Sequence, residues 1–272
     1  DVPAAPIDKT FYWAEKAKNT LVDLGFSETL LYTLVPKGAF EVAYPLASDK
    51  SALRERIAPK LQESLIMNVR NADLLGLEAV KIFEIGQVFP KTGEKTSLCI
   101  GVSQVKKKKG VTSESVLKEA VALLESKLGI KIAGAIETGA YGALIEVDFD
   151  ALIARSVPKN INDLSFTALP KDKTYKPFSH YPFIARDIAL FVPSGTSDAD
   201  VSSVVRASAM KAAGGLLVKG PDLFDRFEKD GKVSYAFRMI FQSSEKTLSD
   251  DEANALMAQI YAAAKAKGWE VR

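Results

Sequence analysis

The chain has 272 residues, 47% of them hydrophobic and 26% charged, as in ordinary globular proteins. Its 36 basic and 34 acidic side chains leave a net charge of +2, which argues against coating of nucleic acid by bulk charge. A single cysteine, Cys99, and a single histidine, His180, exclude an internal disulfide, a cysteine-based zinc cluster and a two-histidine metal site. No run approaches the roughly 18 apolar residues of a membrane span. We expect a cytoplasmic protein, no membrane partner and, since the chain starts at Asp1, a C-terminal piece of a longer protein.

The first part of the chain, residues 1–157, has the pattern of a mixed α/β domain. Apolar residues recur at helical spacing from Phe11 to Leu24, and an apolar strand-like stretch covers Thr29–Val35. Between Ala52 and Val69 an apolar residue returns every fourth position, and Pro59 predicts a helix start or a break. A further helix is expected over Ser113–Leu128, and strands over Val80–Phe89, Leu98–Val105 and Ala143–Phe149. The strands are expected to share one sheet, whose order the pattern does not give.

Prolines punctuate residues 158–177, which predicts a linker between two domains. Residues 178–272 are more regular. Strands are expected over Asp187–Val192, Leu216–Phe227, Val233–Gln242 and Trp269–Arg272, with helices over Ser197–Ala213 and behind a capping box that starts at Ser249. This β-α-β-β-α-β order predicts a ferredoxin-like four-stranded antiparallel sheet with both helices on one face. The fold class is therefore α+β, and the topology alone gives no activity.

Four segments of this second domain recur together in one family: PFIARDIALFV (182–192), LFDRF (223–227), GKVSYAFRMIFQSSEKTLSDDE (231–252) and GWEVR (268–272). Together they resemble the ferredoxin-fold anticodon-binding domain of bacterial phenylalanyl-tRNA synthetase β subunits. In the first domain, YPLASDKSALRERIAPKLQESLIMN (44–68) and VKIFEIGQVF (80–89) resemble the same subunit's catalytic-like domain. The resemblance covers nearly the whole chain.

The resemblance implies a class II synthetase-type first domain that performs no chemistry. It implies two partners, a catalytic α chain in a heterotetramer and tRNA(Phe). ATP and Mg²⁺ are expected in the α-chain active site, and neither catalytic nor metal-ligating residues are expected in this chain. An alternative hypothesis is a ferredoxin-like regulatory or protein-interaction module on a synthetase-derived scaffold.

The positions that match the family's anticodon contacts are Ala189, Asp225, Phe227 and Ser234. The Asp225 carboxylate would accept hydrogen bonds from a base edge, and the Phe227 ring would stack on a base. Ser234 would donate or accept a hydrogen bond, and Ala189 would leave room for a base. The family more often has tyrosine at position 227, so a hydroxyl contact is lost here. Phe227 would serve equally as a core residue, and Asp225 as a turn residue or ion-pair partner.

Other polar and titratable residues have structural interpretations. Arg54 and Arg56, in LRERIAPKL, resemble the position where a class II enzyme holds ATP, but no glycine-rich phosphate loop or matching acidic set accompanies them. The lysine run Lys106–Lys109 is expected to be a solvated loop rather than a phosphate contact. His180 and Cys99 are expected to be structural.

Overall fold

The computed structural model describes residues 8–272 except 107, 155, 158–163, 165–176 and 230. The chain divides into two compact units, Asp1–Leu169 and Pro170–Arg272. Of the predicted linker, 158–177, nearly all lies outside the described residues. Within the described part of the chain, no helix combines the length and apolarity needed to cross a membrane.

The first unit is built on a five-stranded sheet of order β1-β4-β5-β7-β6. The short β1 pairs parallel with β4, and the other neighbours are antiparallel. Almost every residue of the central strand β5 is buried, so its sequence is continuously apolar or small instead of alternating. The strands are β1 (Ser27–Glu28), β4 (Ala79–Val88), β5 (Lys95–Gln104), β6 (Ile136–Gly139) and β7 (Gly142–Asp148).

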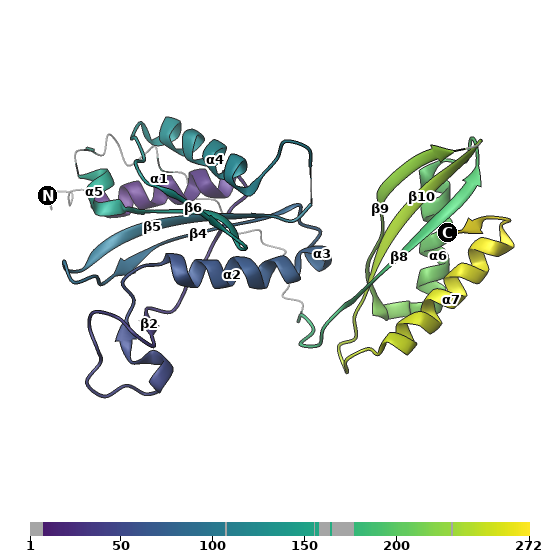
Figure 1. Cartoon of the computed structure of the whole chain (residues 1–272), viewed down its shortest axis with the longest axis horizontal. Coiled ribbons are helices and arrows are strands. Elements are labelled where there is room, and N and C mark those ends of the chain that lie inside the picture. The colour runs from purple at the N-terminus through teal and green to yellow at the C-terminus, as the bar shows by residue number, and fades with distance from the viewer. Residues whose placement is uncertain (1–7, 107, 155, 158–163, 165–176, 230) are drawn as a thin grey trace, which may run out of the picture. The chain divides into compact units, whose positions relative to one another are not determined.

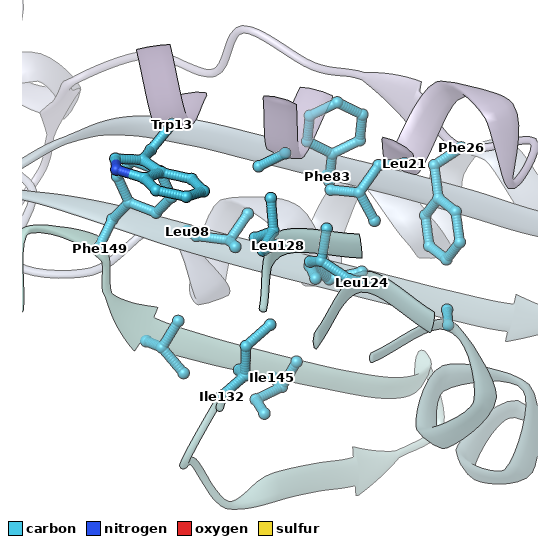
Figure 2. Close-up of a cluster of buried hydrophobic side chains, with 14 of the residues drawn as sticks. Trp13, Leu21, Phe26, Phe83, Leu98, Leu124, Leu128, Ile132, Ile145 and Phe149 are labelled. Atoms are coloured by element: carbon cyan, nitrogen blue, oxygen red, sulfur yellow. The ribbon is translucent and has the colours of Figure 1, made fainter. Parts of the chain in front are cut away.

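Helices cover both faces of this sheet (Figure 1). On one face α1 (Lys9–Asp23), α4 (Ser113–Leu128) and α5 (Phe149–Ile153) bury a core that includes Trp13 and Phe83 (Figure 2). On the other face α2 (Ala58–Arg70) packs a second core against β4, β5 and β7, and the short α3 (Ala72–Leu75) follows it. Pro59 stands in the first turn of α2, so the helix starts there, one of the two predicted outcomes.

The predicted strand over Thr29–Val35 is wrong as a single element. Its neighbourhood holds the end of β1 and, separately, β2 (Leu34–Val35), which pairs with β3 (Ala52–Leu53) in a small second sheet. The expectation that all strands of this unit share one sheet is also wrong, because β2 and β3 form a separate two-stranded sheet. Of the apolar residues between the two strands, only Leu31 packs against the core beneath α2, whereas Leu30 is 96% exposed. A short 3₁₀ helix, η1 (Ser48–Lys50), precedes β3.

The second unit is the predicted ferredoxin-like domain. Its sheet has the order β11-β8-β10-β9, with every neighbouring pair antiparallel. Both long helices lie on one face and bury a single core there (Figure 1). The 3₁₀ helix η3 (Gly214–Leu216) leads into β9. The elements are β8 (Ile184–Pro193), α6 (Asp198–Ala213), β9 (Leu217–Lys229), β10 (Lys232–Phe241), α7 (Asp250–Ala266) and β11 (Glu270–Val271).

Candidate nucleic-acid interface

The sheet of the second unit keeps one face free of helices. Alternate residues of β8 and β10, such as Leu190 and Tyr235, point into the helix-covered core, so the residues between them point to the opposite side. We call this side the open face. Its residues include Asp187, Ala189, Phe191, Asp225, Phe227, Ser234, Ala236, Arg238 and Arg272.

The register of the strands brings the four predicted anticodon residues together. Ala236 is paired with Ala189 on one side and with Asp225 on the other, which forms one cross-strand row. In the adjacent row Ser234 is paired with Phe227 and with Phe191. Both alanines end at Cβ, so the Ala189–Ala236 strip of this row rises little above the backbone beside Asp225.

Ser234 lies beneath two aromatic rings. Phe191 and Phe227 flank it across the sheet, and their ring centroids are 5.7 Å apart at an interplanar angle of 89°. Ser234 is consequently only 1% exposed. Its hydroxyl contacts a ligand only if the two rings separate, whereas Asp225 is exposed and Phe227 is partly exposed. The geometry thus favours Asp225 and Phe227 as the residues that a ligand meets first.

Sequence reasoning missed two residues that contact Phe227. One is Phe191, and the other is Arg272, whose guanidinium carbon lies 5.1 Å from the centre of the Phe227 ring. The alternation in DIALFV would have found Phe191, because Ala189 and Phe191 are two positions apart on one strand. No pattern in the sequence indicates the position of Arg272 over the ring, since it depends on the pairing of β11 with β8.

The charges of the open face differ in how they are paired. Arg238 donates two hydrogen bonds of 2.8 Å to the carboxylate of Asp187 and lies 5.3 Å from the ring centre of the exposed Phe224. Asp225 makes no side-chain hydrogen bond or ion pair with any residue that the structure describes. An unpaired, exposed carboxylate beside an aromatic ring accepts hydrogen bonds from the donors of a base edge.

In the first unit Arg54 is a buried structural residue. It is 3% exposed, and its guanidinium lies 2.7 Å from the carboxylate of Glu84, which is 1% exposed. Arg54 also donates a hydrogen bond to the Gln87 carbonyl at 2.9 Å. Gly86 makes room for this pair, because a Cβ at that position would lie 2.5 Å from the guanidinium. The donors of Arg54 are therefore used inside the protein.

The N-terminus of α2 is occupied by a carboxylate of the same unit. Glu146 on β7 accepts hydrogen bonds from the backbone N–H groups of Ile57 and Ala58 at 2.8 and 3.1 Å. Arg56 pairs with Glu146 and with Glu137, and the hydrogen bond to Glu137 raises the pKa of the guanidinium. A helix N-terminus is a general anion site, but here an internal anion fills it. A cleft of about 430 Å³ lies alongside, lined mainly by residues 35–37, 54–56, 59, 60 and 63.

The remaining titratable residues of the sequence analysis have local roles. Cys99 is buried on β5, where desolvation raises the pKa of its thiol. His180 lies against the ring of Phe178. In the lysine run, Lys108 pairs with Glu78 at 2.6 Å, and this hydrogen bond lowers the pKa of the Glu78 carboxyl. Among the described residues, no group of three histidine, cysteine or acidic side chains is placed to hold a metal ion.

Fold and open face together define an α+β protein that ends in a ferredoxin-like sheet with exposed aromatic and acidic side chains. Comparison with known families agrees with this. Residues 3–152 match the family described as phenylalanyl tRNA synthetase beta chain CLM domain, and residues 179–272 match the ferredoxin-fold anticodon binding domain. The chain belongs to the phenylalanyl-tRNA synthetase beta chain family.

Curated relatives share this similarity along most of the chain. The phenylalanine–tRNA ligase beta subunit of Carboxydothermus hydrogenoformans is 27% identical over 93% of this chain and 37% of its own length. That of Deinococcus radiodurans is 27% identical over 94% of this chain and 35% of its own length. The chain therefore spans little more than a third of the relatives that it matches.

Proposed function

We propose that this chain acts as part of a cytoplasmic phenylalanine–tRNA ligase β chain and binds the anticodon of tRNA(Phe) on its open face. The observation that carries this proposal is the juxtaposition of unpaired Asp225, the Phe227 ring and the Ala189–Ala236 strip on a sheet face without helices. Sheet surfaces of this kind bind unstacked bases through aromatic rings and polar groups at the base edges. The family membership supports the choice of RNA.

The catalytic chemistry belongs, in this proposal, to a partner α chain that activates phenylalanine with MgATP. In the same proposal the first unit has a class II synthetase-type architecture and contributes a scaffold. Arg54 forms an ion pair with Glu84, and the Glu146 carboxylate accepts the hydrogen bonds of the N-terminus of α2. Neither is therefore free to bind a nucleotide phosphate. No catalytic step is assigned to a residue of this chain.

Association with the α chain has a physical basis in the first unit. The segment of residues 30–46 exposes six large apolar or aromatic side chains, namely Leu30, Tyr32, Leu34, Phe40, Tyr44 and Leu46. Apolar residues gathered on one exposed segment are typical of protein–protein contacts. We propose that the α chain covers this segment in the assembled ligase.

A titration of the chain with tRNA(Phe) transcripts tests the anticodon proposal. We expect tighter binding to the native transcript than to one with a swapped anticodon, and we expect Asp225→Ala to reduce that preference. Glu228→Ala is a matched control, because Glu228 is also an exposed carboxylate on β9 but is in register with Val233, whose side chain points to the helix-covered side. Equal binding to all anticodons by the unaltered chain would contradict the proposal and favour a protein-interaction module.

A further inference from the structure

Arg272 differs from the other arginines near the open face. Arg238 is held by Asp187, Arg186 by Asp250, and Arg226 by Glu228. Within the part of the chain that the structure describes, Arg272 has no carboxylate partner. The acidic residue nearest to it on β11, Glu270, is paired with Lys232 at 2.8 Å. The Arg272 guanidinium is therefore held by no side-chain carboxylate among the described residues.

Two contacts hold Arg272 in place. Its backbone N–H donates to the Ala189 carbonyl at 3.0 Å, which extends the pairing of β11 with β8. Its guanidinium lies over the ring of Phe227. A guanidinium packed on an aromatic ring uses its flat face for this contact and keeps its N–H donors at the edge. Those donors are thus not used by the contact with Phe227.

We propose that Arg272 binds a backbone phosphate of the nucleic-acid strand that lies on the open face. The inference rests on the proposed RNA function and adds a phosphate site that complements the base contacts of Asp225 and Phe227. A planar guanidinium with free edge donors matches the two oxygens of a phosphate. Because the second unit is close to neutral, with 14 basic and 13 acidic residues from position 172 onward, one unpaired arginine is a large share of its attraction for RNA.

The test compares Arg272→Gln, Arg272→Lys and Arg226→Gln in the full chain. Arg226 is the matched control, since it lies 5.8 Å from the ring centre of Tyr235 on the helix-covered side of the same sheet. Binding of tRNA(Phe) transcripts, native and anticodon-swapped, is measured at several salt concentrations. Thermal unfolding followed by circular dichroism establishes that each variant is folded.

We expect Arg272→Gln to weaken binding roughly tenfold at low salt for both transcripts alike. The slope of log K against log salt should fall by about 0.7, the value for one phosphate contact on a single strand. Arg272→Lys should restore the slope, and Arg226→Gln should leave affinity and slope unchanged.

Three outcomes would overturn the assignment. If the parent chain binds RNA and Arg272→Gln leaves the salt slope unchanged, the phosphate contact is overturned and the RNA function stands. A loss confined to the native anticodon assigns Arg272 to base reading instead. A parent chain that binds neither transcript overturns the RNA function and the phosphate site together.

Discussion

On the open face, Phe227 is the residue on whose aromatic ring we expect a base to stack. The rings of Phe191 and Phe227 contact each other nearly at right angles, and together they cover Ser234. We predict that Phe227→Leu weakens tRNA(Phe) binding by roughly 1–3 kcal/mol, the contribution of one base stacked on an aromatic ring. Phe227→Tyr keeps the ring and should bind like the parent. A titration with the transcript measures both, and equal affinities for the leucine and tyrosine variants would rule out stacking.

The buried pair of Arg54 and Glu84 governs the stability of the first unit. Removing one partner leaves a charge without compensation in the interior, so Arg54→Met should lower the free energy of unfolding by about 3–5 kcal/mol. The half-exposed Arg56 is the control, because exposed ion pairs contribute about 1 kcal/mol or less. Urea unfolding is followed by the fluorescence of Trp13, which lies in the core of this unit, in a Trp269→Phe background. If Arg54→Met and Arg56→Met lowered the free energy of unfolding equally, the buried position of Arg54 would not matter to stability.

At the level of elements, α7 depends on its capping box. The Ser249 hydroxyl accepts from the Glu252 N–H at 3.2 Å, and the Glu252 carboxylate accepts from the Ser249 N–H at 2.9 Å. Ser249→Ala should therefore destabilise the second unit by about 1 kcal/mol. Trp269, which packs against the core beside α7, reports urea unfolding in a Trp13→Phe background. Ser202→Ala is the control, because Ser202 lies inside α6 and does not cap a helix.

The same cap predicts a pH dependence. The hydrogen bond from Lys246 lowers the pKa of Glu252 from its ordinary value of 4.5. The unfolded chain therefore binds this proton more readily, and the stabilisation is complete above about pH 4.5 and is lost as the pH falls through the folded-state pKa. We expect the stability difference between the parent and Glu252→Gln to shrink between pH 7 and pH 3. A difference that stays constant over this range would contradict the contribution of the ionised carboxylate.

Elements with a strong local signal were predictable, and elements set by distant partners were not. The helix over Ser113–Leu128 was predicted to the residue, because apolar spacing and the glycine that follows it act locally. The strand over Thr29–Val35 failed because its two ends contact different strands: the Thr29 N–H donates to the Phe83 carbonyl of β4, whereas Leu34 and Val35 pair with β3. The four candidate site residues came from resemblance, and only the register of β8, β9 and β10 shows that they are neighbours. The position of Arg272 required the pairing of β11 as well.

For the whole molecule, the two units divide the work that we propose. The second unit exposes polar and aromatic residues on a sheet, a surface suited to RNA, whereas the first exposes apolar side chains on residues 30–46, a surface suited to protein. Each unit has a core of its own. Substitutions on one surface should therefore leave the other function intact, because the two surfaces belong to units with separate cores.

The last prediction concerns residues 30–46. Tyr44 is 93% exposed and Leu46 is fully exposed, so they contribute little to the folding of this chain, and burying them beneath a partner would yield about 25 cal/mol per Å² of apolar surface. Replacing both with serine should reduce co-purification with a co-expressed α chain severalfold and leave the urea unfolding of the isolated chain unchanged. Val218→Thr, at an exposed apolar position of the second unit, is the control. Undiminished capture of the α chain by the double variant would show that association uses another surface.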